Sequence, residues 1–275
     1  MNQHFSTIDV SIDPAGVASV TLAREAVMNA FDETMIAELT QAYTQLSEAP
    51  HVRVVLLRSN GRAFCAGADL QWMQRASRNG PGENLEDAKR YAAMMQAIRL
   101  CKKPTLARVQ GHAFGGGAGL CAASDIVIAS DDACFSVSEA RFGILPAVIG
   151  PYLVEAVGQR QARRLALTGT RLSAREAVEI GLIHQAVPAE RLDQAVERTV
   201  AELRTNGPQA LREIKAFFDE IGDYRMTPAH HDLAARTIAR VRATSEAKEG
   251  FAAFFDKRPP AWLAASSDTG RGERG

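Results

Sequence analysis

The sequence predicts an α/β fold, with parallel strands in its first half and helices in its second. Three short apolar runs, typical of strands covered on both faces, lie at residues 52–57, 104–109 and 125–129. The intervals between them leave room for helices, which 91–100 and 117–123 are apolar enough to form. Right-handed crossovers between such units produce either a doubly wound sheet or a superhelix of repeated turns.

The first 50 residues predict a hairpin followed by a helix. Two β-rich runs at 7–12 and 17–22 flank Asp13-Pro14-Ala15-Gly16, whose residue types favour a tight turn. From Asp32 to residue 49, apolar side chains recur every three or four positions, which indicates an amphipathic helix with Asp32 as its N-cap. The chain is therefore expected to open with β structure.

After Gly143 the signals for strands nearly vanish. Six segments suit helices instead: 151–157, 159–167, 174–180, 189–204, 208–221 and 228–255. A shift in composition near Pro188 divides the chain into a core of residues 1–187 and a helical region of residues 188–263. Residues 264–275 are rich in Ser, Gly and Arg, and we expect this tail to be disordered.

Composition and charge exclude several classes of protein. The 275 residues are 46% hydrophobic and 23% charged, which is typical of a folded globular protein. Lys and Arg number 32, as do Asp and Glu, so no overall basic field attracts nucleic acid or an anionic membrane. The chain shows no pattern of a secretory signal and no apolar stretch near the ~18 residues of a membrane-spanning helix. We expect a cytoplasmic protein with no nucleic-acid or membrane partner.

The four cysteines argue against a metal or disulfide framework. Cys65, Cys101, Cys121 and Cys134 form no CxxC pair and no Cys/His cluster with the spacing of zinc ligands. We expect reduced and mostly buried thiols, as in an intracellular protein, and no metal site.

Two glycine turns carry the strongest chemical signal. The segment 111–120 has five glycines in nine residues between a predicted strand and a predicted helix, where free N–H groups can stabilise an anion or a polarised carbonyl. A second turn, Phe64-Cys65-Ala66-Gly67-Ala68-Asp69-Leu70, follows the preceding strand. If each turn directs one N–H to the same point, the two form an oxyanion hole. Otherwise they are a helix–strand crossing and a strand exit.

One carboxylate stands out as a candidate for proton transfer. Glu139 is flanked in sequence by Val137, Phe142 and Ile144, so we expect partial desolvation to raise its pKa. The alternative is a solvated surface glutamate.

These segments together resemble the enoyl-CoA hydratase/isomerase (crotonase) family over roughly residues 5–263. The resemblance rests on both glycine turns and on Ser138-Glu139 with Gly143. It also rests on the "TGTRLSAREAVEIGL" segment that begins at Thr168, and on residues 254–262 near the end of the chain. It implies a spiral core of repeated ββα units and a helical C-terminal trimerisation region, assembled as a homotrimer or as a hexamer of paired trimers.

The resemblance also implies an acyl-CoA thioester as substrate and assigns roles to residues. Ala68 and Gly116 match the positions whose N–H groups hold the thioester oxygen, and Glu139 matches a catalytic glutamate. Coenzyme A arrives with the substrate, and no other cofactor or metal is implied. Arg24 lies in the "REAVMNAF" segment that matches the CoA channel, although a solvated charge is the alternative. The residues expected to contact CoA are Arg24, Ala26, Ala66, Asp69, Leu70, Phe254 and Lys257, the last two reaching CoA on a neighbouring subunit.

Two departures from the family pattern bear on the reaction. Hydratases of this family with two carboxylates have a glutamate where this chain has Gly119, so one acid/base group is missing. Glu139 then serves both proton transfers or has an unidentified helper. The second departure is the run 146–152. Together with the "FGGGAGL" and "SEARFGILPA" segments, it looks like that of bacterial hydratases acting on 3-methylglutaconyl-CoA or γ-carboxygeranoyl-CoA.

We therefore predict an enoyl-CoA hydratase that adds water across the 2,3 double bond of a 2-enoyl-CoA. A Δ3,Δ2-enoyl-CoA isomerase is the nearest alternative, because moving a double bond needs only one base. A catalytically silent acyl-CoA-binding or RNA-binding protein is another. Dehalogenation or hydrolysis of a thioester on the same scaffold is the third.

Overall fold

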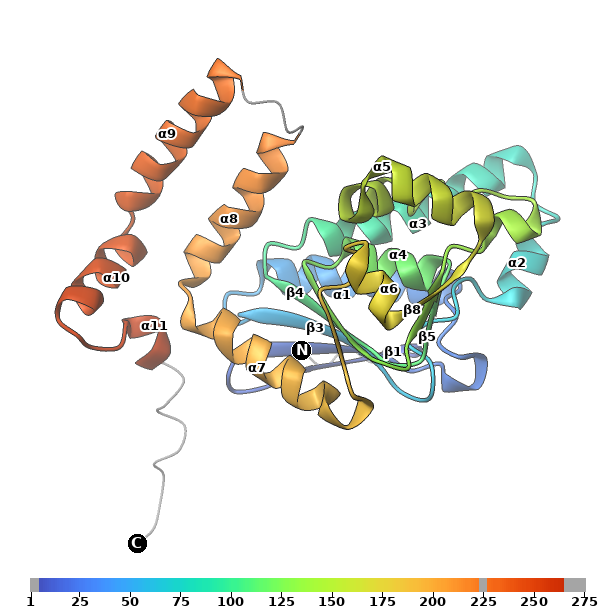
Figure 1. Cartoon of the computed structure of the whole chain (residues 1–275), viewed down its shortest axis with the longest axis horizontal. Helices are drawn as coiled ribbons and strands as arrows, with labels where there is room; N and C mark the ends of the chain where they lie inside the picture. Colours follow the sequence, from blue (N-terminus) through green and yellow to red (C-terminus); the bar gives the residue numbers. More distant parts are fainter. Residues whose placement is uncertain (1–4, 223–226, 265–275) are drawn as a thin grey trace, which may run out of the picture.

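The structure is a computed structural model that describes residues 5–222 and 227–264. It shows two β-sheets covered by helices, from which α8 (Pro208–Ile221), α9 (Pro228–Arg242) and α10 (Ser245–Phe255) extend to one side (Figure 1). The tail predicted for 264–275 lies outside the described residues, apart from Ala264 at the end of α11 (Ala261–Ala264). The predicted α/β class is confirmed.

The larger sheet has six strands in the order β1-β2-β3-β4-β6-β9. They are β1 (Ile8–Ile12), β2 (Val17–Leu22), β3 (Val54–Ser59), β4 (Thr105–Val109), β6 (Ile126–Ser130) and β9 (Gln185–Val187). Strands β1 and β2 form the predicted hairpin, and every other pair is parallel. The Asp13 carboxylate closes the hairpin turn by accepting a hydrogen bond from the Val17 N–H at 2.8 Å.

A smaller sheet runs in the order β5 (His112–Phe114), β7 (Cys134–Ser136) and β8 (Arg171–Ser173), and a bridge from Cys65 to Ala113 extends it. After β3, β4 and β6 the chain thus contributes to this second sheet before it enters a helix or helical turn. The fold is therefore the superhelix of repeated turns rather than the doubly wound sheet. Three-residue strands are too short to show a hydrophobic period, so the sequence did not predict them.

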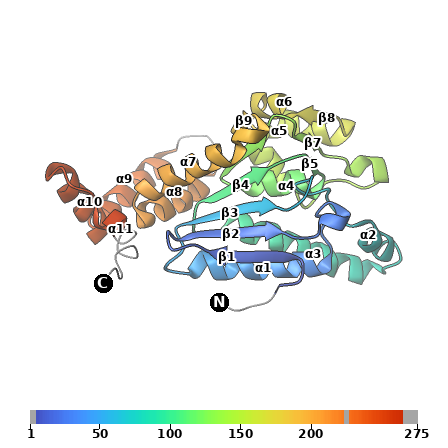
Figure 2. The ribbon, with the colours of Figure 1, turned by 90° about the horizontal axis from the view of Figure 1, so that it is seen from below.

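Helices cover both faces of the larger sheet (Figure 2). The main core lies between one face and α1 (Glu33–Glu48), α3 (Pro81–Arg99) and α4 (Gly116–Ala123). The Asp32 side chain caps α1 as predicted, accepting hydrogen bonds from two N–H groups of the first turn. On the other face, α7 (Leu192–Thr205) buries a smaller apolar cluster of Val17, Leu56, Leu106, Ile128, Leu192, Ala195 and Val196. The boundary predicted near Pro188 stays a prediction.

Several predicted elements need correction. The helix expected over 228–255 is two helices, because the Thr244 side chain accepts a hydrogen bond from Ala247 N–H and caps α10. Helix α3 begins at Pro81, ten residues before the predicted 91–100, and α2 (Leu70–Ala76) follows the second glycine turn, where the sequence suggests Asp69 as a helix cap. Strands β8 and β9 lie in the half expected to be helical. The two helices predicted on either side of Gly158 join in α5 (Gly150–Thr168), which that glycine interrupts with a non-helical φ of 72°.

The cysteines lie as expected: Cys65, Cys101 and Cys121 are buried, Cys134 is half-buried, and all four are free thiols. Among the described residues, no helix is both long and apolar enough to cross a membrane.

Candidate active site

The two glycine turns lie side by side, as the sequence predicts. Cys65 N–H donates to the His112 carbonyl at 3.0 Å, and Phe114 N–H donates back to the Cys65 carbonyl at 3.0 Å. A methyl group on Gly67, in the position of an alanine side chain, would lie 3.6 Å from the backbone nitrogen of Gly116. The smaller sheet therefore brings the two turns together.

Each turn offers at least one free backbone donor among the described residues. Among the described residues, neither the Ala68 N–H nor the Gly116 N–H has a hydrogen-bond acceptor. On either side of Ala68 the backbone is held to Phe31, whose N–H donates to the Gly67 carbonyl and whose carbonyl accepts from Asp69 N–H. Gly116 is the first residue of α4, where N–H groups have no acceptor within the helix. Two converging donors of this kind can hold a thioester oxygen as it gains negative charge.

Glycine is required at the N-cap of α4 and at its first residue, two positions of the segment 111–117 that we call the oxyanion loop. Gly115 has φ +50° and ψ −118°, a conformation that side chains disfavour, and a methyl group there would lie 3.2 Å from Glu139 Oε1. A methyl group on Gly116 would lie 2.1 Å from Phe31 Cζ and 2.5 Å from the Tyr91 hydroxyl oxygen. Other side chains therefore occupy the space that a larger residue would fill, directly beside the free donor.

Glu139 lies against this loop. It begins the short 3-10 helix η2 (Glu139–Phe142), and its carboxylate faces Gly115. Burial raises the pKa of Glu139, although the backbone N–H groups of Ser138 and Glu139 act in the opposite direction. Its Oε2 is buried and has no hydrogen-bond partner among the described residues. A buried carboxylate oxygen without a partner is available for a proton of a bound molecule.

The raised pKa of Glu139 agrees with the direction that the sequence predicts. Of the three neighbours expected to desolvate the carboxylate, Val137 is buried, whereas Phe142 and Ile144 are 59% and 54% exposed. Gly115 also lies close to the carboxylate, since a methyl group on it would lie 3.2 Å from Oε1. The fold thus places a residue of the oxyanion loop, distant in sequence, beside Glu139.

Gly119, at the position where the family resemblance implies a second glutamate in two-carboxylate hydratases, packs against the apolar side chains of Ile149 and Met95. A methyl group on Gly119 would lie 2.3 Å from Ile149 Cγ2 and 3.4 Å from Met95 Cε. Ile149 comes from the run 146–152 that departs from the family pattern. The two departures therefore lie side by side in the structure, where the Ile149 side chain fills the space beside Gly119.

We expect Gly119→Ala to destabilise the protein by about 1–3 kcal/mol, because the added methyl group overpacks against Ile149. Urea denaturation followed by circular dichroism measures this free energy of unfolding. The matched control is Gly82→Ala in α3, where nothing lies within 4 Å of the new methyl group and helix propensity favours alanine by ~0.5–1 kcal/mol. Ile149→Ala should remove most of the cost of Gly119→Ala. An equal cost with and without Ile149 would contradict this account.

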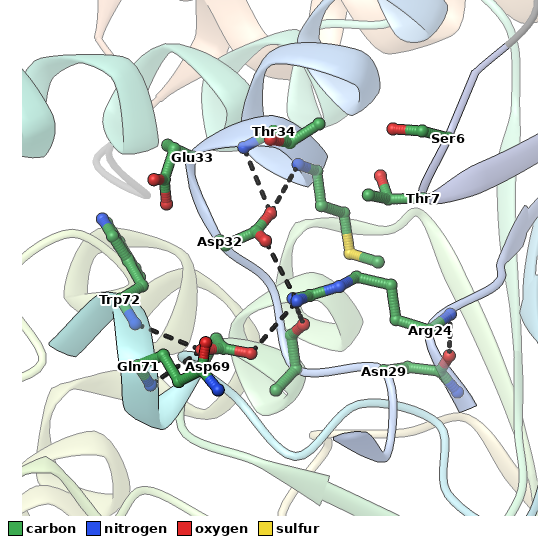
Figure 3. Close-up of polar contacts among 12 residues, drawn as sticks. Ser6, Thr7, Arg24, Asn29, Asp32, Glu33, Thr34, Asp69, Gln71 and Trp72 are labelled. Carbon is green, nitrogen blue, oxygen red and sulfur yellow. Dashed lines mark hydrogen bonds and ion pairs between the residues drawn. The ribbon is translucent and has the colours of Figure 1, made fainter. Parts of the chain in front are cut away.

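Arg24 lies between the carboxylates of Asp32 and Asp69, the second of which follows Ala68 in the turn (Figure 3). Its guanidinium pairs with Asp32 at 3.0 Å and with Asp69 at 3.1 Å, and it also donates to the Ala30 carbonyl. The alternative of a solvated charge is therefore wrong. Asn29 completes the arrangement: its side chain accepts from Arg24 N–H and donates to the carbonyls of Asn60 and Ala63.

Asp69 has the capping role that the sequence suggests. Its side chain accepts hydrogen bonds from Gln71 N–H at 2.8 Å and Trp72 N–H at 3.1 Å, at the start of α2 (Figure 3). Since the same carboxylate pairs with Arg24, Asp69 ties the first helix after the turn to the segment that precedes α1. Both residues position Ala68, and direct contact with CoA stays a prediction.

The other residues predicted to contact CoA fall into two groups. Ala66 lies in the turn itself and is half-buried, while Ala26 and Leu70 are exposed nearby in sequence. Phe254 is 78% exposed near the end of α10, and Lys257 follows that helix with φ +53°. Helix α10 stands with α8 and α9, apart from α2 and α4 (Figure 1). Within one chain, the structure does not bring these last two residues to the oxyanion loop.

Sequence reasoning gave no role to three side chains of the site: Phe31, Tyr91 and Ile149. Phe31 and Ile149 lie in segments that the sequence analysis singles out, 24–31 and 146–152, whereas Tyr91 lies in no motif. For Tyr91 the signal was the glycine at 116, because a required glycine implies a large neighbour that the sequence cannot identify. Among the described residues, no cluster of three or more His, Cys, Asp or Glu side chains could hold a metal ion.

Known proteins resemble this chain in sequence and in fold. A family model described as Enoyl-CoA hydratase/isomerase matches residues 13–265. A probable enoyl-CoA hydratase of Rhodobacter capsulatus is 36% identical over 264 residues, which cover 94% of this chain and 98% of that relative. The crystal structure of an enoyl-CoA hydratase from Shewanella pealeana superposes on this chain with a TM-score of 0.91 and 38% identity. The match covers 95% of this chain and 97% of that protein. An enoyl-CoA hydratase from Mycobacterium smegmatis matches with a TM-score of 0.88 and 32% identity, over 94% of this chain and 99% of that protein.

Proposed function

The chain belongs to the enoyl-CoA hydratase/isomerase family, and from this premise we propose that it adds water across the 2,3 double bond of a 2-enoyl-CoA. One observation carries the proposal. Two free N–H groups, of Ala68 and Gly116, lie beside one buried carboxylate, that of Glu139, with an oxygen that has no partner among the described residues. This arrangement suits a reaction that passes through a thioester enolate.

In the proposed mechanism the two N–H groups hold the thioester oxygen throughout, and Glu139 carries one proton from water to C2. The thioester oxygen accepts hydrogen bonds from Ala68 and Gly116 N–H, which makes C3 electrophilic. The oxygen of water bonds to C3 as Glu139 takes one proton from that water, and the electron pair of the double bond moves onto the thioester oxygen. Glu139 then returns the proton to C2, and the carbonyl re-forms. Water is thus added whole, and the carboxylate ends as it began.

The isomerase is the second candidate, and the packing at Gly119 favours it. Ile149 fills the space beside that residue, so no second carboxylate assists Glu139 from position 119. A single base can remove a proton from C2 of a 3-enoyl-CoA and return it to C4 through a dienolate, which leaves the double bond between C2 and C3. The same oxyanion hole would stabilise that dienolate.

For the acyl group we propose a branched chain like that of 3-methylglutaconyl-CoA, on the resemblance of run 146–152 together with the "FGGGAGL" and "SEARFGILPA" segments. CoA enters and leaves as part of the substrate, and we propose no further cofactor or metal. In this proposal Arg24, Ala26, Ala66, Asp69 and Leu70 belong to the CoA channel of one subunit, which Phe254 and Lys257 of a neighbouring subunit complete.

We propose a homotrimer or a hexamer, the assembly that the family resemblance implies. Large apolar side chains are exposed on the helices that extend from the core: Ile214, Phe218, Ile238, Phe251, Phe254 and Phe255. Burying such side chains between subunits is favourable. Sedimentation equilibrium should give a mass of three or six chains, and a monomer would contradict the proposed shared CoA site.

Mass spectrometry of the acyl-CoA products tests the reaction directly. The protein is incubated with 3-methylglutaconyl-CoA, crotonyl-CoA and a 3-enoyl-CoA, and chromatography separates the double-bond isomers. Gain of one water on a 2-enoyl substrate supports hydration, and the best substrate identifies the acyl group. A product of unchanged mass from the 3-enoyl substrate alone would establish the isomerase instead. Release of free thiol would indicate a thioesterase, and no turnover on any substrate would favour a binding protein.

A further inference from the structure

Tyr91 lies at the oxyanion loop without being part of either glycine turn. It comes from α3, and its ring packs on Phe31 with the ring centroids 5.1 Å apart and the planes tilted by 50°. Its hydroxyl oxygen is 2.5 Å from the point that a methyl group on Gly116 would occupy. The Phe31 contact thus directs the hydroxyl to the residue that supplies a free N–H.

The hydroxyl is available to a bound molecule as a donor. Among the described residues it has no hydrogen-bond partner, although the ring is packed into the site. Burial and, second, the negative charge of Glu139 hold the pKa of Tyr91 well above its ordinary value. The phenol therefore keeps its proton at neutral pH and can donate it in a hydrogen bond. A neutral acid in an apolar site is a strong donor to an enolate oxygen.

We propose that the Tyr91 hydroxyl is a third donor to the thioester oxygen, beside the N–H groups of Ala68 and Gly116. This inference rests on the proposed enolate chemistry of the same site. The phenol transfers no proton and forms no bond. It donates a hydrogen bond that strengthens as negative charge develops on the oxygen, and so it lowers the free energy of the enolate. Glu139 still takes the proton from water and delivers it to C2.

The test separates the enolate from the addition of water. Exchange of the C2 protons of butyryl-CoA for deuterium in D2O requires the enolate but no double bond and no water addition. Tyr91→Phe keeps the ring on Phe31 and removes only the hydroxyl. We expect it to lower kcat for hydration of crotonyl-CoA and the exchange rate by the same factor of ~10–100, with KM little changed. Its urea midpoint should match that of the wild type, because the hydroxyl has no described partner.

Tyr43→Phe is the matched control. Tyr43 also has a pKa raised by burial and a hydroxyl without a hydrogen-bond partner among the described residues, but the groups that act on it are Cys101 and Asp125 and not Glu139. Both rates should be unchanged in this variant.

The outcomes distinguish this inference from the proposed function. If Tyr91→Phe slows hydration but not exchange, the hydroxyl acts on the water and the inference is overturned. If neither rate changes, Tyr91 has no part in the reaction and the inference is overturned. Glu139→Gln is run in parallel, since an enzyme that keeps both rates without this carboxylate refutes the proposed function itself, whatever Tyr91→Phe does.

Discussion

Glu139→Gln is expected to lower kcat for hydration by ~10²–10⁴-fold, the usual contribution of a general acid/base group. Glutamine keeps the size of the side chain beside Gly115 but cannot take a proton from water or return one to C2. The loss should be near the upper end of that range, because Ile149 fills the space where a second carboxylate would stand. Steady-state kinetics with the preferred 2-enoyl-CoA measure it.

Exposed Glu197→Gln on α7 is the control for this substitution and should leave kcat unchanged. An active Glu139→Gln enzyme would mean that another group moves both protons.

The pH dependence should report the same carboxylate. Burial raises the pKa of Glu139 above 4.5, and hydration begins with the ionised form, so kcat/KM should rise with pH through a midpoint above 4.5. The Gln variant should lose this limb. A midpoint at or below 4.5, or a limb that persists in the variant, would contradict the assignment.

The raised pKa has a consequence of opposite sign for stability. The folded protein favours the protonated form of Glu139. The contribution of Glu139 to stability is therefore present below its pKa in the unfolded chain and is lost as pH rises through its higher pKa in the folded protein. At pH 7 Glu139 is therefore a net cost to folding, and Glu139→Gln should unfold at the same urea concentration as the wild type or at a higher one. A lower midpoint would show that the carboxylate supports the fold.

Gly116→Ala is expected to lower kcat by ~10²–10³-fold, the usual loss when one oxyanion-hole donor is removed. Gly116 has helical backbone angles that alanine accepts, so the effect comes from space and not from φ. The methyl group would meet Phe31 Cζ at 2.1 Å and the Tyr91 oxygen at 2.5 Å, and relieving both contacts must move the N–H or the two rings. Kinetics with a 2-enoyl-CoA, together with circular dichroism to confirm folding, measure the loss.

Gly82→Ala again serves as the control, because its methyl group meets open space. A Gly116→Ala enzyme that folds and keeps the wild-type kcat would show that the Gly116 N–H does not hold the thioester oxygen.

Much of the fold is readable from local sequence. The period of apolar residues after Asp32, the turn chemistry of 13–16 and the apolar runs of β3, β4 and β6 each depend on neighbours a few positions away, so the sequence predicts them. Strands β5, β7, β8 and β9 have three residues each, and long-range pairing decides their existence. The break at Thr244 competes with an otherwise continuous helical pattern and was missed for that reason.

The sequence by itself determined which chemical groups the site can contain. Two glycine turns, Glu139 and the absence of a carboxylate at 119 are properties of composition and order, and the resemblance to a family follows from them. Only the tertiary structure decided how those groups are used. It set Arg24 between two carboxylates, placed Ile149 against Gly119 and brought Tyr91 to Gly116. Apart from Arg24 and Asp32, which are eight positions apart, these contacts join residues 25 to 45 positions apart, and local sequence carries no record of such pairings.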